Sequence, residues 1–170
     1  NDTFISSQND GIDTIDGGDD SDTIDYSSET DAVEISLNTS LESIVSINGV
    51  ANDKIKNIEN IITGSGDDTL GGDSSNNVFN ANDGIDTIDY SYINNVASYD
   101  AGVIVDLSIQ NAQDLSTIAV TGNQVGIDTL IDFENVIGSK NNDILIGNAE
   151  DNSLFGGSGD DTLKGGAGDD

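Results

Sequence analysis

The chain has 170 residues, 33 of them Asp or Glu against only 4 Lys or Arg, and its net charge at pH 7 is -29. Nucleic acid is a poor candidate as a ligand, because phosphate is bound by clustered Lys and Arg and the lysines here are scattered. The absence of Cys and His removes disulfides, thiolate sites and the usual ligand of zinc, copper and nickel, which leaves a cation with oxygen ligands.

No run of about 18 apolar residues is present, so no membrane span is expected, and no signal-peptide pattern opens the chain. Apolar residues make up 34% of the chain, which without a ligand would place it near the disordered class. We therefore expect folding to depend on a multivalent cation that offsets the charge.

The first part of the chain contains two aspartates in glycine-rich turns, each followed two residues later by isoleucine. Asp13 and Asp22 are nine residues apart and precede Ile15 and Ile24. Glycine permits positive φ and leaves carbonyls uncovered, and calcium takes about six to eight oxygen ligands, so both aspartates are predicted metal ligands. Asp20 stands where glycine is expected in the second turn, so a weaker site is expected there.

Two segments, 26–58 and 90–133, lack the glycine loops. Both alternate apolar and polar residues, at 32–37 and 103–107, which is typical of half-buried strands. We expect a solenoid to continue through them with longer, ion-free turns, and a β-hairpin that bulges from the coil is the alternative. Four tyrosines are expected to be core or capping residues rather than a sugar platform: Tyr26, Tyr90, Tyr92 and Tyr99.

Two further stretches, 64–89 and 138–170, repeat the glycine pattern with a period of nine. Each block has a glycine turn, an acidic or amide residue at the sixth place and a large apolar residue at the eighth. About three residues remain for a strand, and the eighth-place side chain is the one predicted to point inward. The sixth places are Asp68, Asn77, Asp86, Asp143, Asn152, Asp161 and Asp170, and the eighth places are Leu70, Phe79, Ile88, Leu145, Leu154 and Leu163.

Some positions depart from this pattern. Asn77 and Asn152 carry an amide oxygen that can ligate a cation but adds no charge. Glu59 and Glu134 stand nine residues before Asp68 and Asp143, and are either marginal ligands or solvated charges.

A longer period of 75 residues organises the whole chain. It relates residues 1–4, 76–79 and 151–154 to one another, and 58–62 to 133–137. We therefore predict one continuous array over residues 1–170, with long repeats at 1–75 and 76–150 and a partial one at 151–170. Because both ends cut through a block, we expect the array to be an excerpt of a longer protein.

The block at 156–164, GGSGDDTLK, with 165–170 behind it, resembles the RTX, or haemolysin-type, calcium-binding nonapeptide repeat. The resemblance implies an all-β fold: a parallel β-roll or β-helix solenoid, with several calcium ions stacked between glycine-rich turns along both edges. Each ion would lie between loops two blocks apart. The implied ligands are the pairs Asp68 with Asp86, Asp143 with Asp161 and Asn152 with Asp170, and the carbonyls of Gly66, Gly84, Gly157, Gly159, Gly166 and Gly168.

The resemblance also implies export by a type I secretion system and folding outside the cell, where calcium is abundant. We expect a calcium-dependent structural segment of a secreted or cell-surface bacterial protein: an adhesin rod, a surface-layer unit or an extracellular filament unit. The alternatives are the non-catalytic tail of a secreted enzyme and a carbohydrate- or ice-binding face. Catalysis is not expected, since no His, Cys or Arg can activate a nucleophile. Calcium is the expected partner, and self-association or contact with neighbouring repeats stays open.

Overall fold

The computed structural model describes residues 1–8, 11–38, 41–92, 101–109 and 126–170. This part of the chain consists of short strands, loops and one 3₁₀ helix, and none of its helices is long and apolar enough to cross a membrane. The elements are β1 (Thr3–Ile5), β2 (Thr14–Asp16), β3 (Thr23–Asp25), β4 (Val33–Ser36), β5 (Ser43–Ile47), β6 (Val50–Lys56), β7 (Asn60–Ile62), β8 (Thr69–Gly71), β9 (Val78–Asn80), β10 (Thr87–Asp89), β11 (Ala101–Asp106), η1 (Leu107–Ile109), β12 (Thr129–Ile131), β13 (Asn135–Ile137), β14 (Asn142–Ile146), β15 (Ser153–Phe155) and β16 (Thr162–Lys164).

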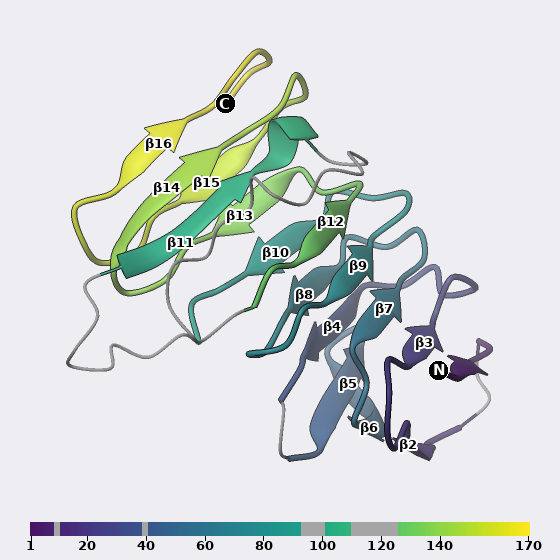
Figure 1. Cartoon of the computed structure of the whole chain (residues 1–170). Helices are drawn as coiled ribbons and strands as arrows, with labels where there is room; N and C mark the ends of the chain where they lie inside the picture. Colours follow the sequence, from purple (N-terminus) through teal and green to yellow (C-terminus); the bar gives the residue numbers. More distant parts are fainter. Residues whose placement is uncertain (9–10, 39–40, 93–100, 110–125) are drawn as a thin grey trace.

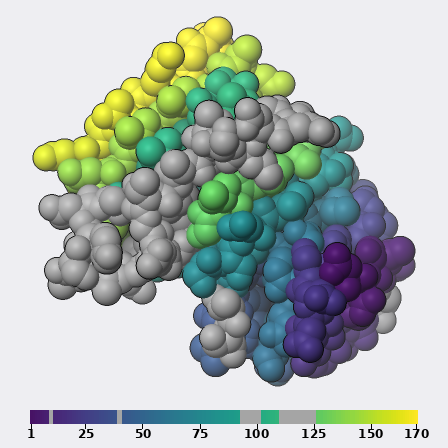
Figure 2. Space-filling model, in the orientation of Figure 1, coloured from purple at the N-terminus to yellow at the C-terminus, as the bar shows by residue number. Residues whose placement is uncertain are grey.

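Successive strands alternate between two faces of a roll, as β7 to β10 illustrate (Figure 1). The described strands form a five-stranded sheet in the order β1-β3-β7-β9-β12, an eight-stranded sheet in the order β15-β13-β10-β8-β4-β5-β6-β2, and a three-stranded sheet in the order β11-β14-β16. The N-terminal and C-terminal parts of the chain lie at opposite ends of the molecule (Figure 2), but the advance is not steady, since β11 pairs with β14 before the chain returns to β12 beside β9. The expected parallel β-roll is thus confirmed.

The core of the roll is a column of inward-pointing residues from the middle of each strand. Parallel pairing sets Ile61 beside Phe79, and Leu70 beside Ile88. These four side chains are completely buried, as the alternation of a strand requires. Leu145 is also completely buried, whereas Leu154 is partly buried and Leu163 is 49% exposed on the last rungs of the roll.

The tyrosines agree with the prediction where the structure describes them. Tyr26 and Tyr90 are buried in the core, and Tyr92 packs against it, while Tyr99 lies outside the described residues.

The segment 26–58 does not continue the roll in the way expected. Strand β5 runs antiparallel to both β4 and β6, although β4 still pairs in parallel with β8 and β6 with β2. Asn48 and Gly49, with φ of 50° and 72°, form the two-residue turn that Asn-Gly favours in hairpins. The expectation that the coil continues through this segment with longer turns was therefore wrong for β5, and the hairpin alternative holds, but the hairpin lies within the sheet rather than bulging from it.

In the segment 90–133 the described parts do pair in parallel, β11 with β14 and β12 with β9. Residues 93–100 and 110–125 lie outside the described part, so the prediction for them stays a prediction.

Several strands related by the 75-residue shift lie on opposite faces of the roll, whereas β1 and its counterpart β9 lie in the same five-stranded sheet. Strand β7 belongs to the five-stranded sheet, and its counterpart β13 belongs to the eight-stranded sheet; β9 and its counterpart β15 differ in the same way. The glycine loops between 63 and 86 and their counterparts between 138 and 161 therefore lie on opposite edges of the roll.

Candidate metal-binding edges

The glycine-rich turns form two rows, which we call the first edge and the second edge. Turns of the first edge lead into the eight-stranded sheet, and turns of the second edge lead out of it. The loops of the first edge include 63–68, 81–86 and 147–152, with 165–170 stacked on the last of these, and those of the second edge include 17–22, 72–77, 138–143 and 156–161.

Loops 18 residues apart stack backbone against backbone, and glycine is what permits the contact. A Cβ on Gly84 would lie 2.3 Å from the carbonyl oxygen of Gly66, and one on Gly159 would lie 2.5 Å from that of Asn141. Both glycines have left-handed φ, of 151° and 127°, which side chains disfavour. The same close approach occurs at Gly157, Gly166 and Gly168.

Asp20 adopts a left-handed φ of 82° at the place where glycine was expected. The turn therefore keeps its shape at the cost of a strained residue, because a non-glycine side chain rarely occupies this region.

The sixth-place side chains join neighbouring loops into a ladder of hydrogen bonds. The N–H of Asp68 donates to Asp86 Oδ1 at 2.7 Å, and the N–H of Asp143 donates to Asp161 Oδ1 at 3.0 Å. The third predicted pair is also adjacent, since the N–H of Asn152 donates to Asp170 Oδ1 at 3.1 Å. The structure thus brings together all three predicted pairs, each through a carboxylate oxygen and a backbone N–H.

Three of these carboxylates keep one oxygen without a protein partner. Asp22, Asp68 and Asp86 are at most 1% exposed, and the Oδ2 atom of each has no hydrogen bond. A buried anionic oxygen without a partner is costly, so these atoms call for a positive ligand. The residues therefore fit calcium, which accepts carboxylate and carbonyl oxygens in irregular geometry.

Side chains alone would not complete such a site. Within the described residues, no group of three or more acidic side chains is close enough to hold a metal ion. Backbone carbonyls of the stacked loops, such as that of Gly66 next to Gly84, would have to supply the remaining oxygens.

The pKa values of the buried carboxyl groups at the two edges also indicate that a cation is needed. Burial, and then the neighbouring Asp68 and Glu134 charges, raise the pKa of Asp86 from 3.8 to about 7, although the Asp68 N–H opposes the change. Burial is also the main cause that raises the pKa of Asp68, Glu134 and Asp143. Without a cation these carboxyls favour protonation, and a bound cation would reverse that preference.

Other predicted residues have different surroundings. Asp143 is already bonded through both oxygens, Oδ1 to the Val103 N–H and the Ser139 hydroxyl and Oδ2 to the Ser139 N–H. Asp13 is exposed, and its N–H donates to Asp53 Oδ1 at 2.8 Å. Asp143 and Asp13 therefore lack the open buried oxygen of Asp86.

The two asparagines hold neighbouring loops together. Nδ2 of Asn77 donates to the carbonyl of Glu59 at 2.9 Å, and Nδ2 of Asn152 donates to that of Glu134 at 2.8 Å. Their Oδ1 atoms accept backbone N–H groups of their own loops, from Asp73 and Asn148. Each asparagine amide thus forms hydrogen bonds through both its oxygen and its nitrogen, whereas Asp22, Asp68 and Asp86 each leave one carboxylate oxygen without a partner.

Glu59 and Glu134 belong to the ladder rather than to solvent. Glu59 Oε2 accepts the N–H of Asp22 at 2.9 Å, and Glu134 Oε2 accepts the N–H of Asp86 at 2.7 Å. Of the two interpretations left open for them, a freely solvated charge does not fit these bonds.

Two ladder members, Asp53 and Asp128, were missed by sequence reasoning. Asp128 Oδ1 accepts the N–H of Asn77 at 3.0 Å, as Asp53 does that of Asp13. The signal for Asp128 was present, because Gly-Ile-Asp-Thr-Leu at 126–130 repeats Gly-Ile-Asp-Thr-Ile at 84–88. For Asp53 only the isoleucine two residues later hinted at the pattern.

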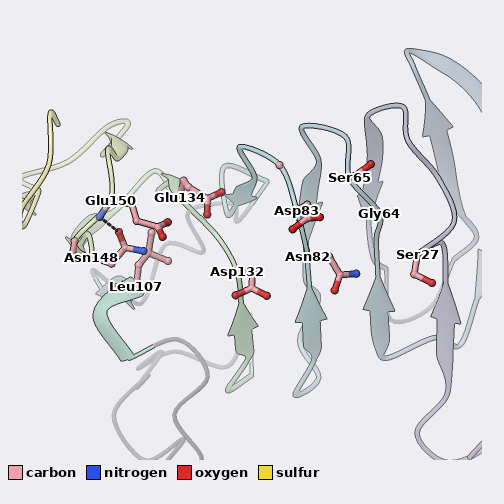
Figure 3. A pocket seen from close by; sticks show the side chains of 12 residues that line it. Ser27, Gly64, Ser65, Asn82, Asp83, Leu107, Asp132, Glu134, Asn148 and Glu150 are labelled. Carbon is pink, nitrogen blue, oxygen red and sulfur yellow. Dashed lines mark hydrogen bonds between the residues drawn. The ribbon is translucent and has the colours of Figure 1, made fainter.

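Along the first edge the loops border an open trough of about 950 Å³. Figure 3 shows its lining, to which successive loops contribute Ser65, Asp83, Asp132, Glu134 and Glu150. The trough is strongly acidic, which suits cations and disfavours anionic ligands.

Comparison with known proteins agrees with this geometry. A search of curated proteins returned no match. A family model described as the RTX calcium-binding nonapeptide repeat (4 copies) matches residues 9–33, 57–88 and 137–170, which together exceed half of the chain. The matched ranges include glycine loops of both edges and most of the ladder residues. The chain therefore belongs to the family of RTX calcium-binding nonapeptide-repeat proteins, and calcium is the cation that its edges are built to bind.

Proposed function

We propose that this chain is a calcium-dependent structural segment of a secreted or cell-surface protein, which folds on calcium binding after export. The observation that carries the proposal is the set of buried sixth-place carboxylates, each with an open oxygen, between glycine loops stacked at 18-residue intervals. Such a design leaves charges buried and unpaired unless cations bind.

The expected energies suffice for folding to be driven by calcium. Extracellular calcium modules have dissociation constants of about 10⁻⁴ to 10⁻³ M. A site at 100 times its dissociation constant adds about 2.7 kcal/mol, so about three such sites would add about 8 kcal/mol. That amount is comparable with the whole stability of an ordinary domain. Sites of this affinity would be nearly empty inside a cell and filled outside it, which supports folding after export.

A spacer or lattice role is the one we favour for the protein. The chain has no His, Cys or Arg for nucleophilic or oxyanion chemistry, so we propose that this segment is not itself catalytic. The strands form a continuous roll whose rungs repeat along one axis, as suits the rod of an adhesin or a unit of a surface layer or filament (Figure 1).

The register of the strands weakens the ice-binding alternative. The pairing Thr3↔Thr23↔Asn60↔Val78↔Thr129 along the five-stranded sheet interrupts threonine at its centre. A flat, uninterrupted ladder of threonines is therefore not present on this face.

The proposal is tested by circular dichroism and isothermal titration calorimetry of the chain in EDTA, in magnesium and in calcium. We expect a coil spectrum in EDTA, strand signal in calcium and several bound calcium ions. Strand signal of equal strength in EDTA would contradict calcium-driven folding. Electron microscopy of the full-length protein with and without calcium then distinguishes a lattice or filament from a monomeric rod.

A further inference from the structure

In each glycine-poor segment, a buried tyrosine hydroxyl donates a hydrogen bond to a buried carboxylate of the ladder. Tyr26 Oη lies 2.8 Å from Asp53 Oδ2, and Tyr90 Oη lies 2.8 Å from Asp128 Oδ2. All four residues are at most 1% exposed. The Oδ1 atom of each aspartate accepts a ladder N–H, so both oxygens of both carboxylates are satisfied within the protein.

The two bonds occupy equivalent places in the fold. Each tyrosine is the first residue after a strand that leaves a glycine block, β3 or β10. Each aspartate stands at the strand that returns to the roll, β6 or β12, and the two aspartates are 75 residues apart. The bonds therefore join the exit and the re-entry of segments in which tyrosine and aspartate are 27 and 38 residues apart.

Buried ladder aspartates thus differ in what meets their second oxygen. Asp22, Asp68 and Asp86 have an Oδ2 atom without a partner, whereas Asp53 and Asp128 have a tyrosine hydroxyl at the same atom. The residues of both sets are buried, and in both sets the Oδ1 atom accepts a hydrogen bond from a backbone N–H. A hydroxyl donor and a cation both stabilise an anionic oxygen, so a carboxylate that already has the hydroxyl gains less from a cation.

We propose that Asp53 and Asp128 bind no calcium, and that the tyrosine hydroxyl takes the place of the cation and closes each glycine-poor segment at its base. The inference rests on the proposed function, since it contrasts these two aspartates with others that bind calcium. Each long repeat then contains one tyrosine–aspartate contact that does not depend on calcium concentration. The contacts between stacked glycine loops, by contrast, do depend on it.

Phenylalanine substitutions test the closure. Tyr90→Phe removes the donor, whereas Tyr92→Phe is a matched control, because the Tyr92 hydroxyl has no hydrogen-bond partner in the described structure. In saturating calcium, urea unfolding should show the unfolding equilibrium constant raised about 10- to 100-fold in Tyr90→Phe. Tyr92→Phe removes a buried hydroxyl that has no partner, so it should leave the constant unchanged or lower it. Equal effects of the two substitutions would overturn the closure.

Asparagine substitutions test whether the carboxylates bind calcium. Asp128→Asn preserves the side-chain shape, keeps an oxygen for the Asn77 N–H and leaves an amide that can donate to the tyrosine oxygen. Calorimetry should therefore count as many bound ions in Asp128→Asn as in the unmodified chain, and at least one fewer in Asp86→Asn. Loss of an ion in Asp128→Asn would overturn the inference.

The two proposals can fail separately. If Asp86→Asn kept every ion, the proposed calcium ladder would fail, while the tyrosine closure would still be judged by the Tyr90 and Tyr92 pair. Tyr26→Phe and Asp53→Asn repeat the experiment in the first segment, so a variant that does not fold leaves an independent measurement.

Discussion

Replacing Asp86 by asparagine should stabilise the ion-free roll and reduce what calcium adds to it. Asp86 is completely buried, its Oδ2 atom has no partner, and its pKa is raised to about 7, mainly by burial. Asparagine keeps an oxygen for the Asp68 N–H. Asn77 and Asn152 show that an amide at this place can also donate to a carbonyl 18 residues earlier.

The two effects have opposite signs and similar size. Removing an unpaired buried charge should raise the ion-free unfolding free energy by about 1 to 3 kcal/mol. Loss of a site filled at 100 times its dissociation constant should lower the calcium-dependent gain by about 2.7 kcal/mol. In saturating calcium the variant should consequently be close to the unmodified chain in stability, although it reaches that stability with fewer ions.

The assay is urea unfolding followed by circular dichroism, in EDTA and in saturating calcium. Trimethylamine N-oxide brings the folded fraction of the ion-free chain into a measurable range, because excluded osmolytes favour burial. Asp19→Asn is the control, since it removes one charge from an exposed side chain of the second edge. A lower stability of Asp86→Asn in EDTA, or an unchanged gain from calcium, would refute the reasoning.

Three further outcomes are expected. In EDTA the folded fraction should fall as the pH rises from about 5 to about 8, because the pKa values of Asp86 and Asp128 are raised to about 7 in the fold, mainly by burial, and protonation therefore favours the folded state; circular dichroism against pH measures it, and a rise with pH would contradict the cause. Asn77→Asp replaces an amide that donates to a carbonyl of the neighbouring loop, so it should destabilise the chain in EDTA and add a bound ion in calorimetry. Gly159→Ala should cost more than Gly11→Ala, since both have left-handed φ but only the Cβ at 159 would meet a carbonyl, at 2.5 Å; equal melting temperatures would show that stacking does not limit this position.

The roll itself was predictable because its determinants are local and periodic. A sixth-place Asp or Asn and an eighth-place apolar residue recur every nine residues, and the structure buries Leu70, Phe79 and Ile88 as that period requires. The predicted neighbours Asp68 and Asp86 are adjacent for the same reason, because two blocks make one coil.

The features that were missed lie where the period stops. The hairpin of β5 and β6 had its own signal in Asn48-Gly49, which is the strongest short-range indication of a hairpin turn. Alternation alone does not distinguish a parallel rung from an antiparallel one, so the hairpin was only the alternative prediction for this segment.

The tyrosine closures could not have been predicted by any spacing rule. The partners are 27 residues apart in one segment and 38 in the other, so no common period relates them. What decides the pairing is burial, since a tyrosine hydroxyl in the core needs an acceptor and a carboxylate there needs a donor. Only the three-dimensional path of the segment brings the two together.

The exchange of faces between the glycine stretches 64–89 and 138–170 affects how charge is distributed along the roll. Between 64 and 89 the aspartate pair Asp68 and Asp86 lies on the first edge and Asn77 on the second. In the next glycine stretch the aspartate pair, Asp143 and Asp161, lies on the second edge. An even number of crossings would have put both pairs on the same edge, where like charges repel until cations bind. The exchange of faces thus places the aspartate pair of one glycine stretch on the first edge and that of the next on the second edge, with an asparagine loop on the edge opposite each pair.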